Sequence, residues 1–460
     1  MRILLFFTTF LIGALQLPAA TITINGNSNT PATVLRILIA DDLVSGRYTL
    51  LAQTNTDFKG AFSLQAQIQS ISFARIAAGA DYTDILLTPG ATYHIQIHKT
   101  KTDYTSFYDA PAITVDILQA DDQGVYQAIE KINLIYNAFV LEHFQSLYRL
   151  KQAAYLDSLH MILNKQVNVS HPFVEQYLFY KLASLEPVVK NMTTSQVFEK
   201  YFLHRPILYD NPEYISLFKE FFGSYYTEHR LIGHARFLEA IAQGDNSLRQ
   251  LMATDPLISS YPAFGELILL YQLQSFFSHP QLSPKVVEER LLQIANTSSI
   301  YKHRIIARNI IFMQSYLAFG APAFDFQLLD QSGKLYELSQ DSSSVVILNF
   351  IRENCPLCEY ELQDLQQLSA KYATQLKVVS ISVRESYPYY SRLFHQNRYH
   401  WKLLNLNQQY EILDTYQVRF FPYNIILLPS TRIGQCPAPT QYLELENQLK
   451  RLVPEWTTSP

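Results

Sequence analysis

The stretch that decides the fold is "VVILNFIRENCPLCEYELQDL", residues 345–365, where a short apolar run leads into two cysteines and a helical pattern. The β-branched run from Val345 to Phe350 predicts a buried strand. After a short turn, leucines recur three residues apart, which predicts a helix beginning near Cys355. Pro356 suits the first helical position, because an N–H there would have no partner. The sequence therefore predicts a strand, a turn and a helix that starts at the cysteine pair.

Cys355 and Cys358 of this stretch are separated by two residues. At a helix start, unpaired N–H groups and the helix dipole stabilise a thiolate, so the pKa of Cys355 should fall to about 7 or below. Cys355 is the expected nucleophile, and Cys358, one turn later and less exposed, is the expected resolving thiol. A zinc site and a pair of inert buried thiols are the alternatives. Zinc needs four ligands and no second ligand pair is recognisable, so no metal is expected.

The composition of the whole chain indicates a globular protein with more than one domain. It has 460 residues, 48% of them hydrophobic, which is enough for several domains with hydrophobic cores. A formal net charge of -4 gives no basic field, so nucleic-acid partners are not expected. Residues 1–20 combine an early arginine, an apolar run and a small-residue end, which predicts a cleaved signal peptide and export to the periplasm or cell envelope. An uncleaved N-terminal anchor is the alternative. No later stretch approaches the length of about 20 residues that a membrane span needs.

Three segments of different periodicity follow. Residues 21–120 alternate apolar and polar positions between turns, which predicts a small antiparallel β-sandwich. Residues 121–318 carry apolar residues three and four apart, broken by prolines, which predicts an all-α region; residues 124–166 are expected to be continuous helix. The aromatic residues there are predicted to pack between helices, and a ligand groove lined by them is the alternative. Residues 320–456 alternate strand and helix patterns, which predicts an α/β domain with a parallel crossover.

Residues 320–456 also resemble the thioredoxin superfamily, specifically its TlpA/ResA-like branch of exported thiol-disulfide oxidoreductases. The opening "GAPAFDFQLLDQSGKLYELS", the "CPLC" pair and "YQVRFFPYNIILL" carry the resemblance. It implies a thioredoxin-like fold and a redox disulfide between Cys355 and Cys358. It also implies protein thiol or disulfide substrates, an upstream redox partner and no cofactor.

Further positions carry expectations from this resemblance. Phe421 and Pro422 match the superfamily's cis-proline dipeptide, whose backbone faces the cysteines and pairs with extended substrate chain; a trans turn proline is the alternative. Glu361 matches the acidic residue beside the dithiol in ResA-like proteins. If buried, it could take a proton from Cys358, whereas a solvated surface glutamate is the alternative. The chain departs from the family at Asn354, where tryptophan is usual.

The predicted function is an exported thiol-disulfide oxidoreductase that reduces disulfides of envelope proteins, with the reductive direction resting on family analogy alone. A peroxiredoxin-like site is less well supported, because Arg352 stands where that family has Thr or Ser. The alternative from another class is an envelope binding or assembly protein whose redox domain is vestigial. Cys436 has no local partner and is predicted to be a structural free thiol.

Overall fold

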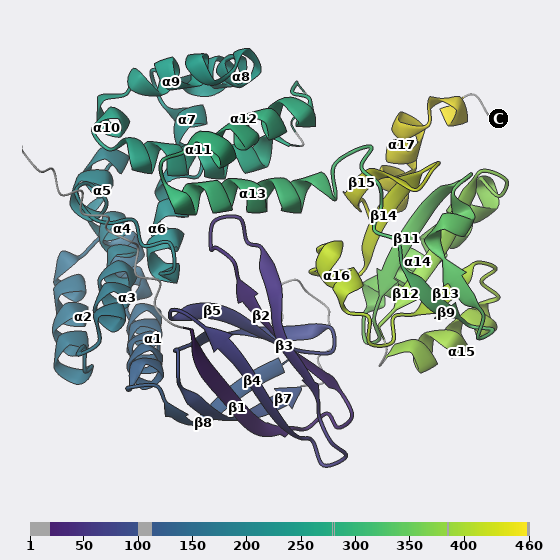
Figure 1. Cartoon of the computed structure of the whole chain (residues 1–460), viewed down its shortest axis with the longest axis horizontal. Coiled ribbons are helices and arrows are strands. Elements are labelled where there is room, and N and C mark those ends of the chain that lie inside the picture. Colours follow the sequence, from purple (N-terminus) through teal and green to yellow (C-terminus); the bar gives the residue numbers. More distant parts are fainter. Residues whose placement is uncertain (1–18, 100–112, 278, 280, 384–385, 458–460) are drawn as a thin grey trace, which may run out of the picture.

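The computed structural model describes residues 19–99, 113–277, 279, 281–383 and 386–457. All but the last two residues of the predicted signal peptide lie outside the described residues. Figure 1 shows a β-sandwich below a stack of helices, with an α/β domain to one side beyond the last helix of the stack. This order of a β-sandwich, helices and an α/β domain confirms the predicted multidomain fold class.

The N-terminal part is built from two four-stranded sheets, ordered β4-β1-β7-β8 and β3-β2-β5-β6. Its strands are β1 (Ala20–Ser28), β2 (Val34–Ala40), β3 (Tyr48–Asn55), β4 (Ala61–Ile68), β5 (Ser72–Ala78), β6 (Asp81–Leu87), β7 (Thr92–Lys99) and β8 (Ile113–Asp121). Buried residues from both sheets, such as Ile24 and Ile76, form one core. One pairing departs from the predicted antiparallel arrangement, because β1 runs parallel to β7. Strands of both sheets separate β1 from β7 along the chain, so the chain can return in the same direction.

The middle part is helical. It contains α1 (Val125–Glu142), the π-helix η1 (Gln145–Arg149), α2 (Ala153–Gln166), α3 (Pro172–Ala183), α4 (Glu186–Lys190), α5 (Thr194–Tyr201), α6 (Pro212–Phe222), α7 (Tyr225–Glu228), α8 (Gly233–Gln243), α9 (Asp245–Ala253), α10 (Pro256–Ser259), α11 (Pro262–Phe276), α12 (Pro284–Thr297) and α13 (Tyr301–Ser315). Proline is the first residue of several of these helices, where its missing N–H costs nothing. The predicted breaks at Pro172, Pro212, Pro256, Pro262 and Pro284 therefore coincide with helix starts, whereas Pro206 lies in a loop and Pro280 lies outside the described residues.

The expectation of one continuous helix over residues 124–166 is wrong. The chain forms α1, η1 and α2 instead, and Lys151 adopts a positive φ of 53° between η1 and α2. Ile132 of α1, Leu147 of η1 and Leu159 of α2 are buried in the same hydrophobic core. Because successive helices share one core, the apolar periodicity continues across breaks that it does not reveal.

Many aromatic residues of the helical part pack in its core, as predicted, whereas Phe144, Tyr301 and Phe312 are exposed. Phe202, Phe222 and Phe264 are fully buried. The rings of Phe222 and Phe264 meet edge to face with their centroids 4.9 Å apart, a favourable geometry for aromatic pairs. These residues therefore stabilise helix packing.

The C-terminal part has a seven-stranded sheet in the order β10-β9-β13-β12-β11-β14-β15. Its strands are β9 (Gln327–Asp330), β10 (Leu335–Glu337), β11 (Val345–Ile351), β12 (Leu376–Ser382), β13 (Lys402–Asn405), β14 (Tyr423–Leu428) and β15 (Arg432–Ala438). Its helices are the 3-10 helix η2 (Leu338–Asp341), α14 (Pro356–Lys371), α15 (Tyr387–Asn397), α16 (Glu411–Thr415), α17 (Tyr442–Leu452) and the 3-10 helix η4 (Pro454–Thr457). Since β11 pairs in parallel with β12 and α14 joins them, the predicted crossover is present.

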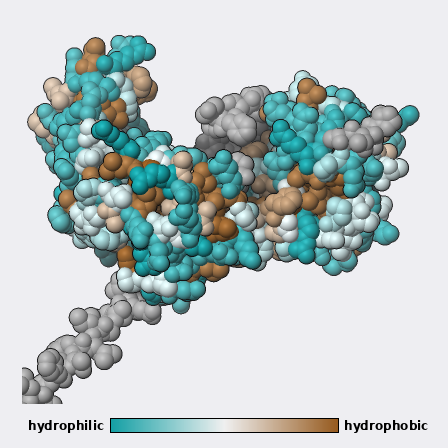
Figure 2. Space-filling model, turned by 90° about the horizontal axis from the view of Figure 1, so that it is seen from above, coloured by the Kyte–Doolittle hydropathy of each residue, from teal (hydrophilic) through white to brown (hydrophobic). Residues whose placement is uncertain are grey.

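The sheet of the C-terminal part has a separate hydrophobic core on each face. One core holds residues of α14, α15 and α17 together with both cysteines of the pair, and the other holds residues of α16. Figure 2 shows hydrophobic residues in separate patches among hydrophilic ones on the face seen from above. Within the described ranges, no helix is long and apolar enough to cross a membrane. The predicted domain boundaries near residues 120 and 318 stay predictions.

Candidate active site

The cysteine pair lies where β11 gives way to α14. Asn354 has a positive φ of 55° and turns the chain, and Cys355 is the N-cap of the helix. The backbone N–H of Cys358 donates a hydrogen bond to Sγ of Cys355 over 3.1 Å. The two cysteines form a disulfide with their Cα atoms 5.3 Å apart. In the reduced protein, the same N–H and the helix dipole favour a thiolate on Cys355.

The expected difference in exposure between the two cysteines is almost absent. Cys355 is 1% exposed and Cys358 is 0% exposed, because both belong to the core beside α14. Exposure therefore does not explain a difference in reactivity. The two sulfurs differ in one contact, because the hydrogen bond from the N–H of Cys358 ends on Sγ of Cys355.

The predicted substrate-binding dipeptide lies against the pair. The Phe421–Pro422 peptide bond is cis, and the carbonyl oxygen of Phe421 is 3.7 Å from Sγ of Cys355. A second cis bond joins Cys436 to Pro437, which the sequence analysis did not anticipate. Cys436 forms no disulfide, and burial raises the pKa of its thiol to about 11. It is thus a structural thiol, as predicted.

Glu361 is buried, so the alternative of a solvated surface glutamate is wrong. Only 3% of the residue is exposed. It follows Cys358 by three residues on α14, which places both on one face of the helix. Burial raises the pKa of Glu361 to about 8, a hydrogen bond from Asn424 lowers it and the charge of Asp364 raises it. At neutral pH this carboxyl can hold or release a proton beside the cysteine pair.

A chain of buried polar side chains continues from Glu361 across the sheet. Asn424 Nδ2 donates to Glu361 Oε1, and Asn349 Nδ2 donates to Asn424 Oδ1 over 2.8 Å. Ser380 Oγ donates to Asn349 Oδ1 over 3.3 Å, and Trp401 Nε1 donates to Ser380 Oγ over 2.9 Å. Asn424 is not among the site residues predicted from the sequence. The signal that could have identified it is an asparagine within the apolar run of β14, because a buried polar side chain needs a hydrogen-bond partner.

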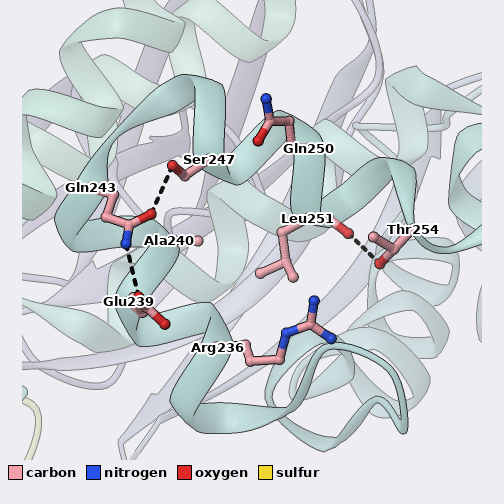
Figure 3. Close-up of a pocket in the computed structure, with 8 residues that line it drawn as sticks. All are labelled: Arg236, Glu239, Ala240, Gln243, Ser247, Gln250, Leu251 and Thr254. Atoms are coloured by element: carbon pink, nitrogen blue, oxygen red, sulfur yellow. Dashed lines mark hydrogen bonds between the residues drawn. The ribbon is translucent and has the colours of Figure 1, made fainter.

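A polar pocket also lies in the helical part, away from the cysteine pair. Figure 3 shows a pocket between α8 and α9 in the helical part, with Gln243 donating to Glu239 and Ser247 donating to Gln243. The pocket is lined by Arg236, Glu239, Ala240, Gln243, Ser247, Gln250, Leu251 and Thr254. The described part of the chain contains no group of three or more His, Cys, Asp or Glu side chains that could hold a metal ion.

The similarity to known proteins lies in the C-terminal part of the chain. Residues 319–433 match the model of the AhpC/TSA family. The C-terminal part has a thioredoxin-like α/β fold. The predicted thioredoxin-like fold and the predicted resemblance to that superfamily are therefore confirmed for residues 319–433, which are a minor part of the chain.

Solved structures similar to this domain include the thioredoxin domain of a thiol-disulfide oxidoreductase from Bacteroides vulgatus, with 18% identity, a TM-score of 0.28 and coverage of 30% of this chain and 99% of that one. A secreted disulfide oxidoreductase from Mycobacterium tuberculosis has 19% identity, a TM-score of 0.25 and coverage of 28% and 95%. An exposed lipoprotein thioredoxin from Streptococcus pneumoniae has 21% identity, a TM-score of 0.25 and coverage of 28% and 99%. No curated protein matches the chain.

Proposed function

We propose that the protein is an exported thiol-disulfide oxidoreductase that reduces disulfides of cell-envelope proteins. The observation that carries the proposal is the position of Cys355, which caps α14 and accepts the N–H of Cys358 beside the Phe421 carbonyl. This environment lowers the pKa of a thiol and so supplies a thiolate nucleophile at neutral pH. Export is proposed from the sequence of residues 1–20.

The proposed reaction transfers two electrons from the dithiol to a substrate disulfide. The Cys355 thiolate attacks one substrate sulfur, which forms a mixed disulfide and releases the other substrate sulfur as a thiolate. Cys358 then attacks Sγ of Cys355, which releases the second substrate sulfur and forms the Cys355–Cys358 disulfide seen here. An upstream dithiol partner must return two electrons before the next cycle.

Two further side chains have proposed roles in this reaction. Glu361 accepts the proton that Cys358 loses when it attacks the mixed disulfide, since its raised pKa makes it a base of suitable strength near neutral pH. The backbone at Phe421 and Pro422 binds an extended substrate segment next to Cys355, because the Phe421 carbonyl already lies against that sulfur.

Reduction of insulin disulfides with dithiothreitol as electron donor tests the proposal. The full chain should accelerate insulin precipitation, Cys355→Ser should abolish the acceleration, and the matched variant Cys436→Ser should retain it. No acceleration by the correctly folded chain would favour the envelope binding or assembly protein instead. A reduction potential of about -270 mV for the Cys355–Cys358 pair would support the reductive direction, whereas one of about -120 mV would indicate an oxidant.

A further inference from the structure

The β-sandwich contacts the redox loop through a buried ion pair. Arg352 follows β11 and precedes Cys355 by three residues, whereas Asp81 begins β6 of the sandwich. Nη1 of Arg352 donates to Oδ1 of Asp81 over 2.7 Å, and Nη2 donates to Oδ2 over 3.1 Å. The side chains of Arg352 and Asp81 are 13% and 4% exposed. A bidentate ion pair that is largely shielded from water is both strong and geometrically specific.

Arg352 connects this ion pair to the active site. Its guanidinium lies over the ring of Phe421, 5.3 Å from the ring centroid, at a distance typical of cation–π contact. The carbonyl oxygen of the same Phe421 is 3.7 Å from Sγ of Cys355. The backbone carbonyl of Arg352 accepts a hydrogen bond from Tyr390 Oη over 2.6 Å. The loop before Cys355 is thus held by the sandwich, by the cis-proline dipeptide and by α15.

Asp81 carries a negative charge in this position. Burial raises the pKa of Asp81, but the charges and hydrogen bonds of Arg352 and Lys99 outweigh burial and hold it below its ordinary value. Nζ of Lys99 lies 3.0 Å from Oδ2 of Asp81. The carboxylate therefore offsets positive charge beside the redox loop.

We infer that the sandwich supplies Asp81 as a positioning residue of the redox site, which fixes the loop before Cys355 and offsets the charge of Arg352 beside Phe421, whose carbonyl lies against the Cys355 sulfur. The inference rests on the proposed function only in treating Cys355 and Cys358 as a reversible dithiol. It gives the N-terminal domain a role in tuning the redox equilibrium of the C-terminal domain.

A second ion pair between the same two domains provides a control. Arg36 of β2 pairs with Asp414 of α16, and its guanidinium lies over the ring of Tyr410. Val34 of β2 is buried in the core of the C-terminal domain beside α16. These contacts dock the sandwich on the face of the sheet opposite to the cysteine pair. Asp414→Asn therefore perturbs docking without touching Arg352.

The charges of Asp81 and Arg352 determine the sign of each expected effect. Reduction adds two electrons and two protons to the Cys355–Cys358 disulfide, and the Cys355 thiol then ionises in part. Asp81→Asn removes one negative charge from the site, which stabilises the thiolate and favours the dithiol. Arg352→Gln leaves the negative charge of Asp81 and favours the disulfide. In the double variant the two changes cancel in net charge, so the equilibrium should return towards that of the wild type.

The test is the redox equilibrium of the full chain in buffers of reduced and oxidised dithiothreitol, read by alkylation and mass spectrometry. Asp81→Asn should shift the equilibrium constant about tenfold towards the dithiol, which is about 30 mV for two electrons. Arg352→Gln should shift it in the opposite direction, and the double variant should lie between the two single variants. Asp414→Asn should stay within about twofold of the wild type, since Asp414 pairs with Arg36 and not with Arg352.

Several results would overturn the inference. The first is a shift of the equilibrium constant in the same direction in both single variants. The second is a shift in Asp414→Asn as large as that in Asp81→Asn. The third is no shift in either single variant when circular dichroism shows that both are folded. If Asp81→Asn fails to fold, Arg352→Gln tests the inference by itself. This variant keeps the ion pair of Asp81 with Lys99 inside the sandwich, so the sandwich should still fold. The proposed function is tested by a different measurement. If the chain does not reduce insulin, the equilibrium of its cysteine pair with dithiothreitol can still be measured, so the two proposals can fail independently.

Discussion

Replacing Glu361 by glutamine should remove most of the pH dependence of the stability of the C-terminal domain above about pH 5. The pKa of Glu361 is raised from its ordinary 4.5 to about 8 in the folded protein, chiefly by burial. Between these two values the folded state binds more protons than the unfolded state, so this group stabilises the domain at low pH. The stabilisation is lost as the pH rises through the folded-state pKa.

The magnitude follows from the size of the shift. Each unit corresponds to about 1.4 kcal/mol, so the wild type should lose about 4 kcal/mol of unfolding free energy between about pH 5 and about pH 8.5 from this group. Glutamine removes the titration but keeps an oxygen that can accept the hydrogen bond from Asn424. The variant should therefore lose little of this stability over the same range.

The chain allows a selective assay. Its two tryptophans, Trp401 and Trp456, are both buried in the C-terminal domain, so urea unfolding followed by their fluorescence reports this domain alone. The protein is kept oxidised, so that Cys355 and Cys358 do not titrate. Glu444→Gln, at an exposed site on α17, serves as the matched control and should keep the wild-type pH dependence. Identical pH dependence in Glu361→Gln and the wild type would refute the assignment of a buried, proton-holding Glu361.

Three other predictions concern the cysteines and the domain boundary. Cys358→Ser should accumulate mixed disulfides on acid-quenched non-reducing gels and Cys355→Ser should trap far less, because only Cys355 accepts the helix N–H; equal trapping would contradict these roles. Cys436 should react slowly with iodoacetamide at about pH 8 until the domain unfolds, since its pKa is raised to about 11, and rapid alkylation in peptide mass maps of the native protein would contradict the raised pKa. A fragment of residues 320–456 should unfold cooperatively by tryptophan fluorescence, although less stably than the full chain because it lacks the contacts of Val34 and Arg36; a broad, non-cooperative transition would argue against the boundary.

The sequence by itself determined the local features of the redox site. A β-branched run followed by a turn and recurring leucines specifies β11 and α14, because each depends on residues that are near one another in the chain. The same is true of Cys355 at the helix start, of Pro356 after it and of the prolines that begin helices. The cysteine spacing and the Phe421-Pro422 dipeptide pointed to a thioredoxin-like domain through resemblance, and the fold agrees.

Only the tertiary structure decided which side chains are buried and which distant residues meet. Glu361 looks like any polar helix residue in the sequence, and its pKa is raised because α14 packs that face against the sheet, where Asn424 contacts it. The pair between Asp81 and Arg352 joins residues 271 positions apart. No local pattern encodes such a pair, because its free energy depends on the docking of two domains and on the water that docking removes.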